Sequence, residues 1–144
     1  MKKVFIDANI FFAASYSKNG GSALILELAK KKKIKIITVS YALAEAEKNI
    51  ELKLGQKYLS IHHQNILDIN PEIQSLDNLN LETIHMLENF LVLKDIPILA
   101  GALFSKAEFL ITLDKRDFLD NKKLTNLNLP FKILNPENFI KNYF

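Results

Sequence analysis

The sequence predicts a three-layer α/β/α domain with a mainly parallel central sheet, and two patterns lead to this prediction. Short apolar segments typical of strands alternate along the chain with longer segments of helical periodicity. The strand segments are apolar on both faces, as is typical of strands that helices cover on either side. At 144 residues the chain has the length of one domain, because two domains of half that size would each have a marginal core.

The amino-terminal half predicts two β-strands and two helices. The strands are short and apolar, and the helices carry apolar residues at helical spacing. In chain order these elements are a strand over Lys3 to Ile6, a helix from Ala23 to about Lys31, a strand over Ile34 to Val39 and a helix from Ser40 to about Leu54. We expect Ser22 to cap the first helix, and Gly55 to end the second, where a left-handed residue is needed.

The carboxyl-terminal half is predicted to form a pair of helices, then a third helix, two strands and a last helix. Pro71 lies in the polar stretch that separates the first pair, and Pro97 lies in the first turn of the next helix, where proline is tolerated. The expected elements are helices over Gln56 to Ile66, Leu81 to Val92 and Asp95 to about Lys106, strands over Phe109 to Leu113 and Phe131 to Leu134, and a terminal helix from Pro136.

The composition excludes several classes of protein. The longest apolar run, around Ile96 to Leu103, contains Pro97 and Gly101 and is too short to span a bilayer. Cysteine is absent, so there is no disulfide framework and no thiolate metal site, and we expect a cytoplasmic protein. The formal charge of +3 permits contact with a polyanion without indicating one.

Five acidic residues from separate parts of the sequence are expected to meet at one edge of the sheet. Asp7 and Asp114 follow predicted strands directly, and Asp117 follows one turn later. Glu45 lies in the second turn of a helix, and Asp95 lies at the start of another. In a parallel sheet the carboxyl ends of strands and the amino ends of the following helices share one side, where ligands usually bind.

Clustered carboxylates predict a divalent metal site. They repel one another and raise each other's pKa unless a cation compensates. Oxygen ligands without a cysteine or histidine suit hard cations, so Mg²⁺ or Mn²⁺ is expected before Zn²⁺. Such an ion can activate water and neutralise charge on a phosphodiester. No other nucleophile in the sequence is convincing.

Four segments resemble the acidic motifs of PIN-domain proteins, in the order that this family has them. Val4 to Phe11 is similar to the opening strand with its Asp-x-Asn ending, and Leu43 to Glu45, followed by Ile50, resembles the second motif. Lys94 to Leu103 resembles the third, and Ala107 to Phe118 resembles the fourth and is the most distinctive. Each is weak alone, but together they cover most of the chain.

The resemblance implies a Mg²⁺- or Mn²⁺-dependent ribonuclease, often the toxin of a VapC-like toxin–antitoxin pair. It implies RNA as substrate, an antitoxin protein as a possible partner and a homodimer. By this resemblance Asp7, Glu45, Asp95 and Asp114 form the acidic core, and Asp117 supports the metal or its water.

The resemblance also assigns supporting residues, with two departures from the family pattern. Asn9 and Thr112 would orient the acids by hydrogen bonds. Ala8 stands where a hydroxyl residue is common, which removes one possible polar contact near the metal. Leu113 stands where many members have glycine, and we expect it to be tolerated.

The acids also have simpler structural explanations, although Asp7 is harder to explain in this way, because a carboxylate that ends an apolar strand would lie near the interior. Asp95 could cap a helix, and Asp114 and Asp117 could be turn residues. Glu45 could lie on a solvated helix face, and a helical wheel places Glu47 instead on the stripe of Leu43, Ile50 and Leu54. The family pattern selects Glu45. None of these explanations accounts for all the acids falling on the same edge.

Two questions stay open on the sequence alone. Lys115 and Arg116 are candidate substrate-binding residues, whereas the run from Lys30 to Lys33 is more typical of a solvated helix end.

A haloacid-dehalogenase-type site would have a second aspartate where Asn9 stands, and the pattern of a response-regulator receiver fits no better. The serious alternative is a catalytically inactive PIN-like module that binds RNA or protein. The complete set of mutually repelling acids argues against that alternative.

Overall fold

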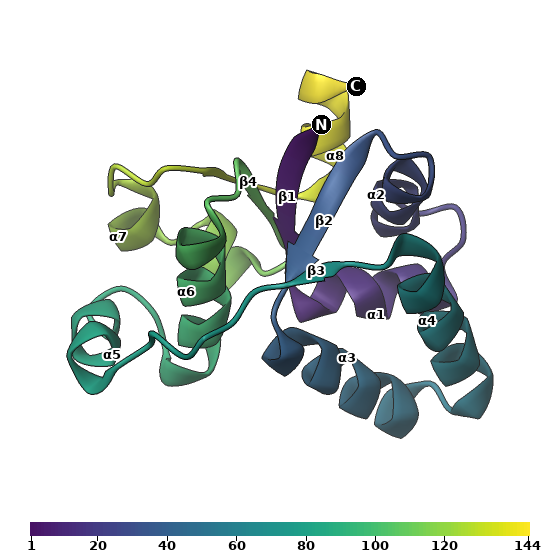
Figure 1. Ribbon diagram of the computed structural model, residues 1–144, viewed down its shortest axis with the longest axis horizontal. Coiled ribbons are helices and arrows are strands. Elements are labelled where there is room, and N and C mark those ends of the chain that lie inside the picture. The colour runs from purple at the N-terminus through teal and green to yellow at the C-terminus, as the bar shows by residue number, and fades with distance from the viewer.

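A five-stranded, entirely parallel β-sheet forms the centre of the molecule (Figure 1). The computed structural model describes all 144 residues, from Met1 to Phe144. The strands lie in the order β3-β2-β1-β4-β5. Their bounds are β1 (Lys2–Ile6), β2 (Ile34–Thr38), β3 (Glu72–Ile73), β4 (Phe109–Ile111) and β5 (Lys132–Leu134). The predicted parallel sheet is therefore confirmed, with β3 as a fifth strand that was not predicted.

Helices cover both faces of this sheet, which confirms the three-layer architecture. In Figure 1, α1, α2 and α4 lie on one side of the strands, and α6 and α7 lie on the other. The helices are α1 (Ala8–Tyr16), α2 (Gly21–Lys30), α3 (Ser40–Lys53), α4 (Gln56–Ile69), α5 (Leu81–Leu87), α6 (Ile96–Ser105), α7 (Lys122–Thr125) and α8 (Pro136–Tyr143). Two short turns, η1 (Leu93–Asp95) and the π-helical η2 (Lys115–Leu119), complete the chain. None of the helices combines the length and hydropathy needed to cross a bilayer.

Several predicted boundaries differ from the structure, most of them by one to three residues. Ser22 does not cap α2, because the helix already begins at Gly21, and Ser22 is a buried residue within its first turn. The helix after Leu81 ends at Leu87, and β4 ends at Ile111. Gly55 does have the positive φ expected of it, at 100°.

Helix α1 was not predicted, and it begins directly after β1. Asp7 is its N-cap, and the Oδ1 atom of Asp7 accepts a hydrogen bond from the Ala8 N–H at 2.7 Å. The strand therefore passes into the helix without a loop. The side chains of Ile10 and Phe11 are buried, which holds α1 against the rest of the molecule.

Close packing at Gly101 holds α6 against the sheet. A Cβ atom at this position would lie 2.6 Å from Cγ1 of Val39 and 2.8 Å from the ring of Phe5. Both neighbours are completely buried, so there is no free space into which they could move. Only glycine allows α6 to lie this close to the strands. Because Asp95 immediately precedes α6, the same contact fixes the position of that carboxylate.

Candidate metal centre

Acidic side chains from four parts of the fold line one cavity at the carboxyl edge of the sheet. Asp7 follows β1, Asp114 lies just beyond β4, Glu45 lies on α3 and Asp95 precedes α6. The volume of this cavity, called here the acidic cavity, is about 190 Å³. Its lining residues are Asp7, Ala8, Asn9, Phe12, Glu45, Asn49, Lys53, Lys94, Asp95, Ile98 and Asp114. The structure thus brings together four of the five acids in one depression.

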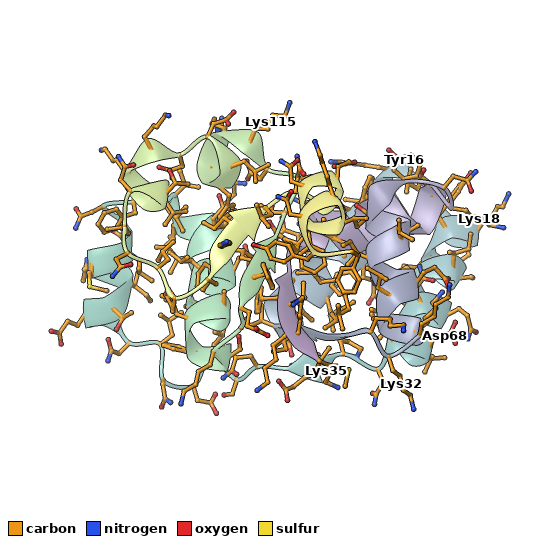
Figure 2. The ribbon with its side chains drawn as sticks, turned by 90° about the horizontal axis from the view of Figure 1, so that it is seen from above. Tyr16, Lys18, Lys32, Lys35, Asp68 and Lys115 are labelled. Carbon is orange, nitrogen blue, oxygen red and sulfur yellow. The ribbon has the colours of Figure 1, made fainter.

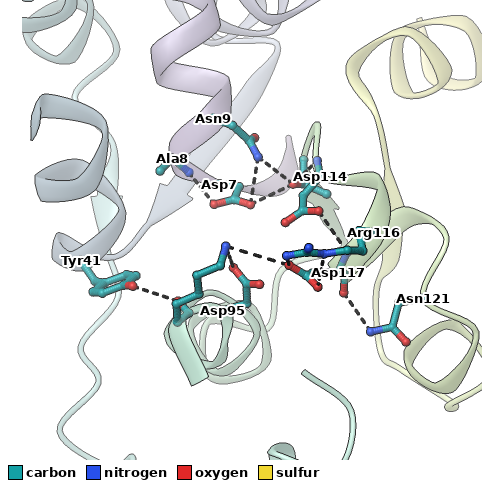
Figure 3. A network of polar contacts seen from close by, with 11 residues as sticks. Asp7, Ala8, Asn9, Tyr41, Asp95, Asp114, Arg116, Asp117 and Asn121 are labelled. Carbon is teal, nitrogen blue, oxygen red and sulfur yellow. Dashed lines mark hydrogen bonds and ion pairs between the residues drawn. The ribbon is translucent and has the colours of Figure 1, made fainter. Parts of the chain in front are cut away.

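Three carboxylates lie close enough to share one ion. Oxygen atoms of Asp95, Asp114 and Asp117 are all within 4.8 Å of one another. Figure 3 shows these side chains converging, with Asp7 facing them from the end of its strand. Asp7 and Glu45 are outside this close group, but both line the acidic cavity beside it.

The surroundings of one oxygen atom in this group indicate whether a cation fits there. Oδ2 of Asp95 is buried and has no hydrogen-bond partner. A buried carboxylate oxygen without a partner costs free energy, which a bound cation would offset. All the donors in the group are carboxylate oxygens, the ligands that Mg²⁺ and Mn²⁺ prefer. The residues present therefore fit a hard divalent cation.

Hydrogen bonds hold the Asp7 carboxylate in one orientation. Besides the contact with Ala8, its Oδ2 atom accepts a hydrogen bond from the Thr112 hydroxyl at 2.8 Å and from Nδ2 of Asn9 at 3.4 Å. Asn9 also accepts one from the Leu113 N–H at 3.1 Å, and the Thr112 hydroxyl accepts one from the Asp114 N–H at 3.1 Å. Asn9 and Thr112 therefore lie between the ends of β1 and β4, where both donate hydrogen bonds to the Asp7 carboxylate.

The structure tests the simpler explanations of Asp95 as a helix cap and of Asp114 as a turn residue. The Asp95 side chain makes no capping hydrogen bond, although the residue occupies the N-cap position of α6. Asp114 does cap η2, because its Oδ1 atom accepts a hydrogen bond from the Asp117 N–H at 3.0 Å. Asp114 is therefore a turn residue as well as a member of the close carboxylate group.

Two cations neutralise only part of this acidic charge. Nζ of Lys94 lies 3.7 Å from Oδ1 of Asp95 and 3.9 Å from Oδ2 of Asp117. Arg116 also contacts Asp117, through its Nε at 3.3 Å from Oδ1 and its Nη2 at 3.4 Å from Oδ2. Asp7, Glu45 and Asp114 have no basic side chain within 4.0 Å. The negative charge facing the acidic cavity is thus largely uncompensated.

This environment shifts the pKa values of the carboxyl groups in different directions. Burial raises the pKa of Asp7 to about 6, although the Thr112 and Ala8 hydrogen bonds oppose the shift, and the charges of Asp114 and Glu45 add to it. Burial also raises the pKa of Asp95 to about 7, and the charges of Asp114 and Asp117 add to the shift. Burial acts on Asp117 in the same direction, but the hydrogen bonds from Arg116 and the positive charges of Arg116 and Lys94 oppose it, and the Asp117 pKa lies below its usual range. Two carboxyl groups are therefore poised to release protons when a cation arrives.

Glu45 and Glu47 face different surfaces of the molecule. Glu45 is half-buried and lines the acidic cavity. The Glu47 side chain is 54% exposed and points to another surface, where it lies 3.8 Å from Nε2 of His63. The buried stripe of α3 consists of Ala42, Ala46 and Ile50, so the helical wheel centred on Leu43 was wrong about the inward face.

The basic residues that line the acidic cavity are Lys53 and Lys94, which the sequence did not single out. Lys53 follows Glu45 by eight residues on α3, and Lys94 precedes Asp95, so helical spacing and adjacency to the acids were available signals. Lys115 and Arg116 do not line the cavity. Both are exposed, and Figure 2 shows Lys115 extending from the outer edge of the molecule.

No protein-family model and no curated protein matches the chain. A solved structure does match it: a chain in the crystal structure of VapBC2 from Rickettsia felis bound to a DNA fragment from their promoter. The TM-score is 0.67 at 18% sequence identity, over 92% of this chain and 98% of that chain. This likeness agrees with the resemblance of the four acidic motifs. The chain has a PIN-like fold. At this identity the likeness describes the PIN-like fold alone, and the function of the acidic cavity must be argued from its own residues.

Proposed function

We propose that this protein is a Mg²⁺- or Mn²⁺-dependent endoribonuclease that hydrolyses phosphodiester bonds. The observation that supports the proposal most directly is the unpartnered, buried Oδ2 of Asp95 within a group of three converging carboxylates. The acidic cavity, with a volume of about 190 Å³, lies beside these groups. A structural role alone does not account for acids that are buried together without enough positive charge.

The proposed ligands of the metal are Asp7, Asp95, Asp114 and Asp117. When bound, the ion would lower the pKa of a water molecule and neutralise charge on the phosphodiester. Thr112 and Asn9 hold the Asp7 carboxylate in place, and second-sphere contacts of this kind commonly change metal affinity or activity by about 10- to 100-fold. Glu45 lines the same cavity and is the proposed acceptor of a proton from the attacking water.

We also propose that the nuclease is the toxin of a type II toxin–antitoxin pair in the cytoplasm. The likeness to a chain of VapBC2 supports this role, as does the sequence resemblance to VapC-like proteins. An antitoxin protein would be its partner, and a homodimer is the expected assembly. Co-expression with a small protein encoded beside it should give a stable complex on size exclusion, and recovery of the chain without that protein would contradict the pairing.

Metal-dependent cleavage of RNA is the first expected result. The purified protein should cut single-stranded RNA internally when Mn²⁺ is added, and excess EDTA should stop the reaction, because chelation removes the ion that compensates the carboxylates. Gel electrophoresis of end-labelled RNA would measure the cleavage. If the protein binds RNA but cleaves neither RNA nor DNA with Mn²⁺ or Mg²⁺, the inactive binding module becomes the better description.

Separate replacement of Glu45 and Glu47 on α3 by glutamine provides a matched pair of variants. Glu45→Gln should lower the cleavage rate by roughly 100-fold, because it removes a proton acceptor from the acidic cavity. Glu47→Gln should cleave as the wild type does, because its exposed side chain faces away from that cavity. Initial rates at saturating Mn²⁺ would compare the two proteins. Equal losses in both variants, or a loss in Glu47→Gln alone, would remove Glu45 from the site.

A further inference from the structure

Lys94 differs from every other lysine of the molecule in its surroundings. It lines the acidic cavity, as Lys53 does, but it alone also contacts carboxylates of the proposed metal site. Its Nζ atom lies 3.7 Å from Asp95 and 3.9 Å from Asp117. In the absence of metal, Lys94 therefore supplies positive charge to two carboxylates that a metal ion would also use.

The backbone of Lys94 is held firmly, but its ammonium group is not. The Tyr41 hydroxyl donates a hydrogen bond to the Lys94 carbonyl oxygen at 2.9 Å, which ties η1 to α3. Both ion pairs of the ammonium group are longer than a hydrogen bond. The Lys94 side chain is also 59% exposed, so little packing restrains it. It can leave the carboxylates without disturbing the fold.

A divalent cation and the Lys94 ammonium group would compete for the same oxygen atoms. Asp95 and Asp117 are two of the three residues whose carboxylates converge within 4.8 Å. Two positive charges at such distances repel each other, and the repulsion is strongest where the surroundings are partly buried. Metal binding therefore weakens the contacts of Lys94. The released ammonium group stays at the wall of the acidic cavity, where a phosphate of the substrate would lie.

We propose that Lys94 is a two-position residue, which pairs with Asp95 and Asp117 in the metal-free protein and with a phosphate of the nucleic acid in the metal-bound one. This inference rests on the proposed nuclease function. In the first position Lys94 lowers the affinity of the site for metal. It also reduces the free-energy cost of burying the negative charges of Asp95 and Asp117. In the second position it binds the substrate next to the metal. The same side chain thus opposes metal binding and supports substrate binding.

Lys53 provides the matched control within the same cavity. Glu45, Asn49 and Lys53 follow one another at intervals of four residues on α3, and all three line the acidic cavity. Lys53 has no acidic side chain within 4.0 Å. Lys53 can therefore contact a phosphate but cannot compete with the metal, so the two lysines should respond differently to replacement.

The test compares Lys94→Met, Lys94→Arg and Lys53→Met with the wild type, first without RNA. Isothermal titration with Mn²⁺ should show about three- to tenfold tighter binding to Lys94→Met, the size expected from losing two partly exposed ion pairs. Lys94→Arg keeps the positive charge and should bind Mn²⁺ within about twofold of the wild type. Lys53→Met should bind Mn²⁺ as the wild type does. Thermal melting of all four proteins would verify that they are folded.

The second measurement is the salt dependence of single-turnover cleavage of RNA at saturating Mn²⁺. Both methionine variants should have lower kcat/KM, and each slope of log kcat/KM against log salt should be shallower by about 0.7, as for one lost phosphate contact on a single strand. Unchanged or weaker Mn²⁺ binding by folded Lys94→Met would contradict the pairing of Lys94 with Asp95 and Asp117 in the metal-free protein. An unchanged salt slope in Lys94→Met would contradict its contact with a phosphate of the substrate. If the wild type itself binds no Mn²⁺, the proposed function fails and this inference fails with it.

Discussion

Asp7→Asn is expected to abolish metal-dependent cleavage and, at the same time, to make the metal-free protein more stable than the wild type. The Asp7 carboxylate is 7% exposed and has no basic partner within 4.0 Å. Asparagine can still cap α1 through its side-chain oxygen. It carries no charge, however, so it removes both a proposed metal ligand and the cost of burying an anion.

The sign of the pH dependence follows from the direction of the pKa shift. Burial raises the pKa of Asp7 from 3.8 to about 6. Between these values the folded protein keeps a proton that the unfolded chain has released, so stability falls as pH rises through this window. Above pH 6 the ionised carboxylate destabilises the wild type by about 3 kcal/mol, at about 1.4 kcal/mol for each pH unit of the shift. Imperfect hydrogen bonding of the amide to Asn9 reduces the gain in Asp7→Asn to about 1–2 kcal/mol.

Urea unfolding of the metal-free proteins at pH 5 and pH 8 would measure this effect. The advantage of Asp7→Asn over the wild type should grow with pH, by about 1 kcal/mol across that range. Adding Mn²⁺ should reverse the order, since only the wild type gains the binding free energy. Asp120→Asn, which neutralises an exposed acid outside the acidic cavity, should change neither stability nor cleavage. A destabilised Asp7→Asn protein at pH 8 would mean that the carboxylate is not an uncompensated buried charge.

Gly101→Val is expected to cause the largest loss of stability of any single change at the interface between α6 and the sheet. The added Cβ would lie under 3.0 Å from Val39 and Phe5, neither of which has space to move. Overpacking of this kind costs about 1–3 kcal/mol for small insertions, and the branched side chain of valine brings the expected loss to about 3 kcal/mol. Movement of α6 away from the sheet would also shift Asp95, so the protein that folds should bind Mn²⁺ more weakly.

Gly101→Ala is the milder variant if Gly101→Val does not fold. Alanine normally stabilises a helix by about 1 kcal/mol relative to glycine, so a net loss of stability here would isolate the steric contact. Gly21→Ala is a suitable control, because its nearest new neighbours lie at 3.0 Å or more and include the flexible end of Glu137. Chemical denaturation would compare the proteins. A gain of stability in Gly101→Ala would show that α6 can move without cost.

The sequence was sufficient for the parallel sheet and for the meeting of the acids, because both depend on local patterns. Continuous apolar segments marked β1 and β4, and an aspartate just beyond each strand must lie at the carboxyl edge of a parallel sheet. The position of Asp95 followed from Pro97, which marks the first turn of α6. These signals require no knowledge of which element packs against which.

Elements that depend on distant contacts were missed. Helix α1 carries apolar residues on its less buried side as well, among them Phe12, Ala13 and Tyr16, so its sequence lacks the one-sided periodicity of a surface helix. Strand β3 has only two residues and exists through its pairing with β2. The inward face of α3 is formed by Ala42 and Ala46, small residues that a search for large apolar side chains overlooks. Packing partners, which no local pattern contains, decided each of these cases.

The direct connection of β1 to α1 has a consequence for how the protein could be inhibited. Asp7 is held on one side by its backbone N–H, which donates to the Ile111 carbonyl at 3.1 Å, and on the other by its role as the cap of α1. No hinge lies between the strand and the helix that could swing this carboxylate out of place. An inhibitor therefore cannot act by moving the Asp7 carboxylate out of the site. It can instead cover the opening of the acidic cavity or place its own cation among the carboxylates.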